Sequence, residues 1–299
     1  MTYKVSSDNY MFSFSKELEP VLRVKSGDVV EIETMDCFAN QIKTNEDKME
    51  SLDWNRINPA TGPVYVEGTE AGDALKVTIE KIEIGDKGVV ATGKGLGVLG
   101  HLMEGLYSRV LDIKDGQVIF NEDISFPTNT MIGVIGVAPK EGSINCGTPG
   151  SHGGNMDTKL IREGSVLYLP VFVEGALFGL GDLHASMGDG EIGVSGVEVC
   201  GSVTVKLEVV KNIGIANPIV KTNDITATIA SAITLDEAVT IATQDMANLI
   251  KLHSSMAMEE IATLMSAVGN LEISQVVDPE KTARFAMPNE ILERLNIQL

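Results

Sequence analysis

Residues 163–171 read EGSVLYLPV, a Gly-Ser turn dipeptide followed by a run of apolar residues. Two further stretches share this arrangement, SGDVVEIET at 26–34 and AGDALKVTI at 71–79, each with Gly-Asp before its apolar positions. Gly, Asp and Ser favour tight turns, and alternating or continuous apolar residues after a turn are typical of a strand. The pattern, used three times, predicts a chain rich in β-strands that begin at glycine-containing turns.

The other strand patterns in the first two thirds of the chain are VLDIKDGQVIF at 110–120 and VSGVEVCGSVTVKLEVV at 194–210. No amphipathic helix pattern lies between these strands, so a sandwich or barrel is favoured over a parallel α/β sheet. The 30 glycines among 299 residues agree with many tight turns. We therefore predict a β-rich catalytic region over residues 1–215, and a boundary near residue 100 would divide it into two β subdomains.

Residues 216–299 have a different pattern, which predicts a smaller α/β unit. The segment 234–255 starts with Thr234 and has Glu237 three positions later, the spacing of a capping box. A second helix is predicted over 256–269, with Gly269 just past its end, followed by a strand at 271–278. The predicted fold class is therefore α+β and β-dominated, with sandwich- or barrel-like strands and a smaller C-terminal α/β unit.

Charge and composition exclude several kinds of partner. The formal net charge is −19 and no Lys/Arg run is present, so we expect no nucleic-acid partner. The N-terminus lacks a signal pattern, and Pro170 and Glu174 interrupt the longest apolar stretch, so no membrane partner is expected. Cys37, Cys146 and Cys200 are odd in number and lack CxxC spacing, which predicts reduced thiols and a cytoplasmic protein.

The stretch GDLHASMGDGE at 181–191 is the first candidate site. Asp182 and His184 are two residues apart at a strand end, so both side chains would point to one face and could hold one metal ion. Glu191 follows the turn at 188–190 and could return to the same pocket as a general base. The alternative is a surface turn in which Asp182 and Asp189 bond to the backbone and Glu191 is solvated.

A second candidate is TPGSHGGNMD at 148–157, which contains His152, Gly153, Gly154, Asn155 and Asp157. Its glycines would let backbone N–H groups and the histidine approach a small ligand closely. Asn155 adds an amide and Asp157 a carboxylate. The alternative is a flexible surface loop whose Asn and Asp side chains cap turns.

Three isolated residues complete the candidate set. Asp36 follows the strand predicted at 26–34, where a β scaffold can direct a ligand inward. Glu67 lies in NPATGPVYVEGTEAGD (58–73), which would form either a pocket wall or a simple hairpin. His101 follows the glycine-rich GKGLGVLG (93–100) and would either gate this loop or face the substrate. That loop matches a dinucleotide-binding fingerprint only loosely, because Val98 replaces its third glycine and no βαβ unit surrounds it.

Three of these segments, in order, resemble the acetamidase/formamidase family: NPATGPVYVEGTEAGD (58–73), HGGNMD (152–157) and LYLPVFVEGALFGLGDLHASMGDGE (167–191). The resemblance extends over nearly the whole chain. It departs from the motif at Met187, where a glutamine is expected. The resemblance implies hydrolysis of a small neutral amide, formamide or acetamide, to the carboxylate and ammonia. It also implies a β-rich fold with a small α/β part, and a homo-oligomer, either a dimer or a dimer of dimers.

Amide hydrolysis needs a nucleophile, an electrophile for the oxyanion and an acid for the leaving nitrogen. Our hypothesis is a divalent metal, Zn²⁺ with Ca²⁺ as the other candidate, held by Asp36, Asp182 and His184. Such an ion would lower the pKa of a bound water towards about 7, and Glu191 would carry the proton to the leaving ammonia. The oxyanion would be stabilised by the backbone of Gly153 and Gly154 with His152 or Asn155. A metal-free variant with Glu191 or Asp36 as the base on water stays open.

Two other functions fit the residues. One is a β-sandwich binding module in which the Asp-Leu-His and Asp-Gly-Glu positions hold a structural Ca²⁺, because oxygen-rich turns suit that ion. The other is a hydrolase of a related small C–N bond, a carbamate or a cyclic amide. Ammonia release from short amides would separate the module from the enzymes, and a substrate panel would separate the enzymes from each other.

Overall fold

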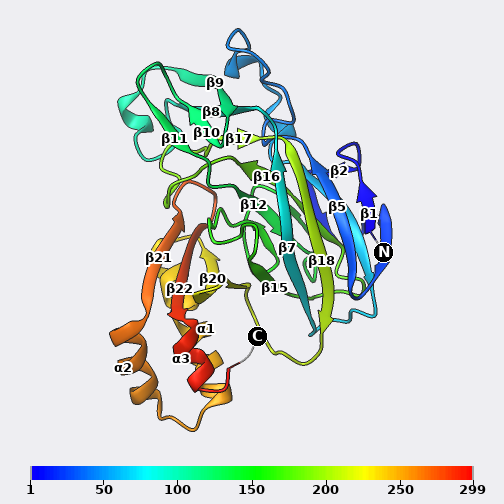
Figure 1. The fold of residues 1–299 in the computed structure, drawn as a ribbon, viewed down its shortest axis with the longest axis vertical. Coiled ribbons are helices and arrows are strands. Elements are labelled where there is room, and N and C mark those ends of the chain that lie inside the picture. Colours follow the sequence, from blue (N-terminus) through cyan, green and yellow to red (C-terminus); the bar gives the residue numbers. More distant parts are fainter. Residues whose placement is uncertain (1, 298–299) are drawn as a thin grey trace.

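The structure is a computed structural model of the chain and describes residues 2–297. Two large sheets form its framework (Figure 1). The nine-stranded sheet consists, in spatial order, of β1 (Thr2–Val5), β5 (Asp28–Thr34), β18 (Gly201–Val210), β7 (Ala74–Ile84), β15 (Val166–Pro170), β19 (Ile219–Lys221), β20 (Ile225–Ala232), β22 (Lys281–Pro288) and β21 (Asn270–Gln275). The three Gly-Asp and Gly-Ser segments become β5, β7 and β15, so this strand prediction is confirmed, and all three lie in one sheet.

The second sheet has 11 strands and carries most of the candidate site. Its main path, in spatial order, is β11 (Ser125–Pro127), β10 (Gln117–Ile119), β9 (Leu106–Lys114), β8 (Lys87–Gly93), β17 (Glu198–Val199), β16 (Phe178–His184), β12 (Met131–Gly136) and β14 (Gly153–Asn155). Three more strands join through β6: β2 (Tyr10–Met11), β4 (Leu22–Lys25) and β6 itself (Ala60–Glu67). A separate two-stranded sheet pairs β13 (Ser143–Asn145) with β3 (Ser13–Ser15).

The main core lies where the two sheets meet. It combines Ile32 and Val77 of the nine-stranded sheet with Ile132 and Leu180 of the 11-stranded sheet, all fully buried. Side chains that alternate along strands of two facing sheets interdigitate in this way in a sandwich. The predicted β-dominated class with sandwich-like strands is therefore confirmed.

The segment 194–210 reads as one strand in the sequence, but the structure divides it at Cys200. Residues before it form β17 in the 11-stranded sheet, and residues after it form β18 in the nine-stranded sheet. Gly201 permits this crossing, because a Cβ there would overlap the carbonyl oxygen of Glu83 on the neighbouring strand β7. The switch places Glu198 in one sheet while the strand that follows it packs in the other.

The C-terminal part contains the three α-helices of the described residues: α1 (Leu235–His253), α2 (Met258–Val268) and α3 (Asn289–Arg294). The predicted capping box is confirmed, since Thr234 Oγ1 accepts from Glu237 N and Thr234 N donates to Glu237 Oε2, both at 3.3 Å. Gly269 caps α2 at φ −86°, outside the left-handed region. Packing explains why this position is a glycine, because a Cβ here would lie 2.5 Å from the ring of Phe285.

The strands of the C-terminal part continue the nine-stranded sheet through the pairing of β15 with β19. One sheet thus crosses the boundary predicted at residue 215, and the pairing of β8 with β9 spans the one near residue 100. The division into units stays a prediction. The three-residue 3-10 helices are η1 (Met49–Ser51), η2 (Trp54–Arg56) and η3 (Gly100–Leu102). No helix within residues 2–297 is long and apolar enough to cross a membrane.

Candidate active site

The centre of the candidate site is the end of β16, which carries Asp182 and His184. On the neighbouring strand β17, Glu198 lies directly opposite His184 in the antiparallel register. His184 Nε2 is 3.1 Å from Glu198 Oε2 and 3.5 Å from Asp182 Oδ1. All three side chains are buried. The structure therefore brings the Asp182–His184 pair together and adds a second carboxylate.

Three more carboxylates converge on this centre from other segments. His184 Nε2 lies 3.8 Å from Asp157 Oδ1, just after β14, and 4.0 Å from Glu191 Oε1, beyond the 188–190 turn. Asp278 comes from the turn between β21 and β22, a hairpin that rises from the helices towards β12 and β16 (Figure 1). Asn155 Nδ2 donates to Asp278 Oδ2 at 3.1 Å. Segments of the chain more than 100 residues apart thus meet at one place.

The backbone at three of these carboxylates is in the left-handed region. The φ angles are 40° at Asp157, 56° at Asp182 and 45° at Glu191. Non-glycine residues adopt such angles uncommonly, at a cost of order 1–3 kcal/mol each, and they cluster at functional sites. Asp182 therefore approaches His184 on a strand with a local kink, where the sequence argument assumed regular alternation.

Two glycines make room for the buried polar side chains. A Cβ on Gly133 of β12 would overlap Asp182 Oδ2 and would lie 2.5 Å from Asp157 Oδ1. A Cβ on Gly196 would lie 2.7 Å from His184 Nδ1. Neither φ angle is in the left-handed region, so close approach alone requires glycine at these positions.

Burial and mutual repulsion govern the charges of the cluster. Burial raises the pKa of Asp157 to about 6 and that of Glu198 to about 8. Burial and the neighbouring charge of Asp157 hold the pKa of Glu191 well above its ordinary value. Burial alone would lower the pKa of His184, but the charges of Glu198 and Asp182 outweigh it and raise that pKa. The cluster thus favours bound protons or a cation over unscreened negative charge.

The donor atoms of the cluster fit a divalent metal ion. In Cys37, Asp182 and Glu198, and separately in Asp157, His184 and Glu191, one potential ligand atom per residue lies within 4.8 Å of the others. Within the described residues, both nitrogens of His184, both side-chain oxygens of Asp157, Asp182 Oδ1 and Glu198 Oε2 are buried without a hydrogen-bond partner. Buried polar atoms without partners are costly, and a cation would satisfy them.

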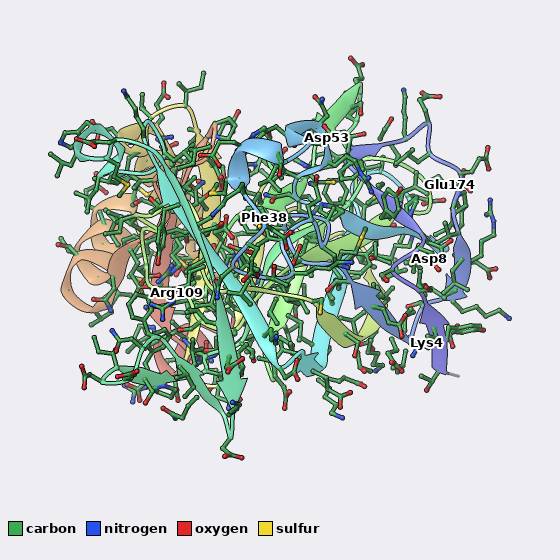
Figure 2. The ribbon with its side chains drawn as sticks, turned by 90° about the horizontal axis from the view of Figure 1, so that it is seen from above. Lys4, Asp8, Phe38, Asp53, Arg109 and Glu174 are labelled. Atoms are coloured by element: carbon green, nitrogen blue, oxygen red, sulfur yellow. The ribbon has the colours of Figure 1, made fainter. Side chains whose placement is uncertain are left out.

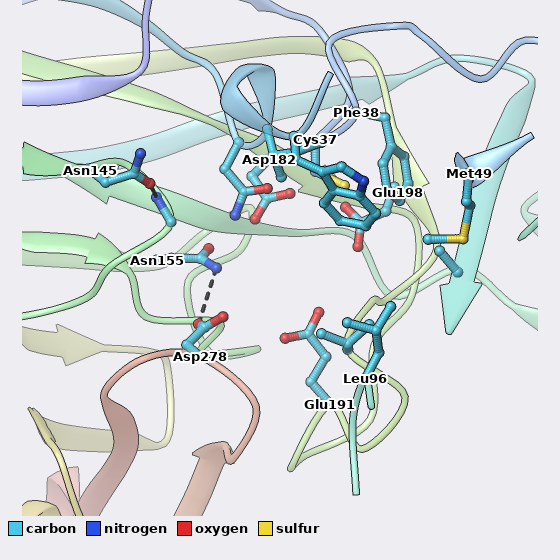
Figure 3. A pocket seen from close by; sticks show the side chains of 16 residues that line it. Cys37, Phe38, Met49, Leu96, Asn145, Asn155, Asp182, Glu191, Glu198 and Asp278 are labelled. Atoms are coloured by element: carbon cyan, nitrogen blue, oxygen red, sulfur yellow. Dashed lines mark hydrogen bonds between the residues drawn. The ribbon is translucent and has the colours of Figure 1, made fainter. Parts of the chain in front are cut away.

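Four carboxylates of the cluster form the floor of a cavity of about 220 Å³, which His184 and Asp157 do not line. Asp182, Glu191, Glu198 and Asp278 direct their carboxylates into it, with Asn145 and Asn155 beside them (Figure 3). The remaining lining residues are Cys37, Phe38, Met49, Trp54, Ile57, Asn58, Ala91, Leu96, Gly147 and Val194. The pocket therefore joins a carboxylate-rich floor to a largely apolar wall.

Other residues of the predicted set lie around the pocket without lining it. Asp36 Oδ1 accepts from Asn40 N at 2.7 Å, and Asp36 is in neither donor group. His152 is buried with its ring edge-on to Phe14, and burial lowers its pKa to about 4. Gly153 N–H donates to Gly150 O at 3.0 Å, within a tight turn that continues into Gly154.

The two predicted substrate-binding residues are exposed and line no part of the pocket. His101 is in η3, and Glu67 ends β6. The substrate-binding roles of His101 and Glu67, the metal role of Asp36 and the oxyanion roles of His152, Gly153 and Gly154 stay predictions.

Four residues of the cluster were missed as site residues by sequence reasoning. Glu198 did carry a signal, since a carboxylate between Val197 and Val199 in an apolar strand is unusual. Asp157 was noticed only as part of its loop. Cys37 and Asp278 carried none, because a lone cysteine is often a core residue and an aspartate in a hairpin turn is common.

The comparisons with known proteins agree on one family. The model of the acetamidase/formamidase family matches residues 5–146 and 142–294. The crystal structure of a recombinant predicted acetamidase/formamidase from Thermoanaerobacter tengcongensis is 66% identical, with a TM-score of 0.99, over 100% of this chain and 99% of that one. The acetamidase of Bacillus halodurans is 45% identical, with a TM-score of 0.97, over 98% and 100%.

Curated relatives are more distant and longer. The formamidase of Methylophilus methylotrophus is 28% identical over 93% of this chain and 88% of the relative. A relative from Schizosaccharomyces pombe is 28% identical over 63% of this chain, and the chain covers 61% of the length of that relative.

Proposed function

The chain belongs to the acetamidase/formamidase family, and from this premise we propose that it hydrolyses short aliphatic amides, formamide and acetamide, to the carboxylate and ammonia. The observation that carries the proposal is the pocket floor, where buried carboxylates surround His184 next to a cavity. Perturbed acids in a cleft are typical of catalytic sites. Relatives named formamidase and acetamidase support the reaction class.

We propose that the floor holds a divalent metal ion, with ligands drawn from Asp182 and His184 together with Asp157, Glu198, Glu191 and Cys37. Imidazole and thiolate donors favour Zn²⁺ over Ca²⁺, which prefers six to eight oxygens. Asp36, the third ligand suggested by the sequence, would act from outside both donor groups. When bound, such an ion supplies Lewis-acid chemistry, polarising the amide carbonyl and making water more acidic.

Glu191 is the proposed proton carrier. Its side chain lines the cavity, and burial together with Asp157 raises its pKa, so it exchanges a proton at a higher pH than an exposed carboxyl group. It would accept the proton of the attacking water and then donate it to the leaving nitrogen. Such transfers contribute roughly 10²–10⁴ to the rate.

Asn155 is the proposed contact to the substrate nitrogen. Its Nδ2 donates a hydrogen bond to Asp278, and its Oδ1 is buried without a hydrogen-bond partner. An oxygen in that position accepts a hydrogen bond from the NH₂ group of an amide. This role differs from the oxyanion donor that the sequence suggests, since an oxyanion needs a donor.

The test is ammonia release from formamide and acetamide. It is measured on the protein as purified, after a chelator has removed all metal, and after metal has been added back. Elemental analysis gives the metal content of each sample. We expect activity to follow metal content. The His184→Ala variant should lose both, whereas Glu141→Gln, on an exposed loop, should keep both. Full activity after complete metal removal would leave the amidase assignment standing and exclude the metal.

We also propose that the protein is cytoplasmic and assembles as a homo-oligomer built from dimers. All three cysteines are free, and Cys37 and Cys146 are buried, which agrees with a reducing compartment. Light scattering after size-exclusion chromatography tests the assembly, and a monomer at micromolar concentration would contradict it.

A further inference from the structure

The cavity above the carboxylates has two chemically distinct sides. Asn145, Asn155 and Asp278 lie on one side, and Phe38, Met49 and Leu96 lie together on the other, next to Glu191 and Glu198 (Figure 3). The apolar side also includes Trp54, Ile57, Ala91 and Val194. A substrate whose amide group binds at the carboxylates would therefore direct its acyl group towards the apolar side.

This cavity is larger than formamide or acetamide requires. Its volume is about 220 Å³. Acetamide has four non-hydrogen atoms and, at ~30 Å³ for each water-sized group, would fill roughly 120 Å³. The other part of the cavity, roughly 100 Å³, would stay occupied by water against apolar side chains. An apolar group in that space would gain from displacing this water.

The apolar side is a preformed wall. Phe38 and Met49 are 4% and 2% exposed and pack in a cluster of their own with Cys37, Ile42, Leu52, Val89 and Ala91, and with the half-buried Ile57 and Leu96. Seen from above, Phe38 lies well apart from the charged side chains of Lys4, Asp8 and Glu174, which lie towards one edge (Figure 2). Trp54 is 50% exposed, so one edge of the wall reaches solvent. Segment 37–57, between β5 and β6, supplies most of this wall.

We propose that this wall is an acyl-chain subsite and that the substrates of this chain include linear amides of four to six carbons, which it takes in preference to acetamide. The inference rests on the proposed function and adds the substrate class. The reaction is unchanged: water supplies the oxygen of the new C–O bond, the C–N bond breaks, and the nitrogen leaves as ammonia after protonation. The longer chain makes contacts with Phe38, Met49 and Leu96 that acetamide cannot reach.

The test is a series of amides from formamide to hexanamide, with ammonia release measured on the metal-loaded protein. Burial of a methylene group is worth about 0.8 kcal/mol, which is roughly a fourfold rise in kcat/KM. Valeramide has three methylenes more than acetamide, so its kcat/KM should be roughly 60-fold higher, mainly through a lower KM.

Two variants of β8 locate the effect. Ala91 lines the cavity, so Ala91→Leu should lower the valeramide-to-acetamide ratio of kcat/KM at least tenfold. Val90, its neighbour on the strand, lines a different cavity with Phe126, so Val90→Leu should leave the ratio unchanged. If Ala91→Leu does not fold, Met49→Ala serves instead. It enlarges the cavity, so the amide with the highest kcat/KM should have a longer acyl chain than in the parent protein.

The possible failures are distinguishable. A kcat/KM that is flat or falls from acetamide to valeramide, with acetamide turned over, overturns the subsite and leaves the proposed function intact. No ammonia from any amide overturns the proposed function and the subsite with it. If kcat/KM rises with chain length but Ala91→Leu and Val90→Leu change the valeramide-to-acetamide ratio equally, the subsite does not lie at this wall.

Discussion

The guanidinium of Arg284 forms two parallel hydrogen bonds with the carboxylate of Asp189, with Nη1 2.9 Å from Oδ1 and Nη2 2.8 Å from Oδ2. Arg284 is fully buried on β22, and its Nε donates to Glu272 Oε2 at 2.7 Å. Beside this pair, Gly190 N donates to Ser274 O at 2.8 Å. The C-terminal hairpin that carries Asp278 is thereby tied to the turn that precedes Glu191.

Removal of the Arg284 charge should destabilise the protein strongly. Arg284→Met would leave Glu272 without this partner and Asp189 with Lys159, 2.7 Å away. Because both carboxylates are 32% exposed, we expect a cost at or below the about 3–5 kcal/mol that is typical of breaking a buried ion pair. We expect that loss in the free energy of unfolding, measured by urea denaturation. Lys81→Met, which removes an exposed ion pair with Glu83, should leave the midpoint unchanged. Similar midpoints for the two variants would contradict the role given to Arg284.

Substitution of Glu191 by glutamine should separate its two candidate roles. Glu191→Gln keeps the size of the side chain but cannot carry the proton, so kcat for acetamide should fall roughly 10²–10⁴-fold. Metal content measured on the same sample assigns the role: retained metal indicates proton transfer, and lost metal indicates ligation. A kcat within threefold of the parent protein would remove Glu191 from the mechanism. Glu141→Gln is the matched control.

A methyl group at Gly133 should disrupt the floor of the pocket. In Gly133→Ala the new Cβ would meet Asp182 Oδ2 and Asp157 Oδ1, so both carboxylates would have to move. We expect metal content and amide hydrolysis to fall together by at least tenfold. The control is Gly105→Ala, where the new Cβ meets nothing within 4 Å and φ is outside the left-handed region. Unchanged metal binding in Gly133→Ala would show that the two carboxylates are not ligands.

The metal-free protein should lose stability as pH rises from 5 to 8. Burial raises the pKa of Asp157 to about 6 and of Glu198 to about 8, so the folded state holds these protons more tightly than the unfolded chain. Each contribution is fully present below the unfolded-state pKa, near 4, and is lost as pH rises through the folded-state value. Thermal unfolding of the protein freed of metal with a chelator, at pH 5, 6.5 and 8, measures this loss of stability. Added Zn²⁺ should restore the melting temperature most at pH 8, where the ligands are deprotonated. A metal-free melting temperature that rises from pH 5 to 8 would contradict the assigned direction.

The regular elements were readable from the chain because their signals are local. Turn dipeptides before apolar runs located β5, β7 and β15, and the Thr234–Glu237 capping box located the start of α1. The segment 181–191 was recognised because its ligand-type residues are adjacent in sequence. Turn chemistry, periodicity and capping depend on residues only a few positions apart, so a single sequence contains them.

The composition of the pocket was decided by tertiary structure. Glu198 reaches His184 only through the register of β17 on β16, Asp278 arrives on a hairpin held by Arg284, and segment 37–57 provides the apolar wall. Each contact joins residues that local patterns treat separately, because strand pairing and burial are set by the whole chain. The sequence by itself determined β5, β7, β15, the start of α1 and the family, whereas the tertiary structure decided which carboxylates meet at His184 and how much space lies above them.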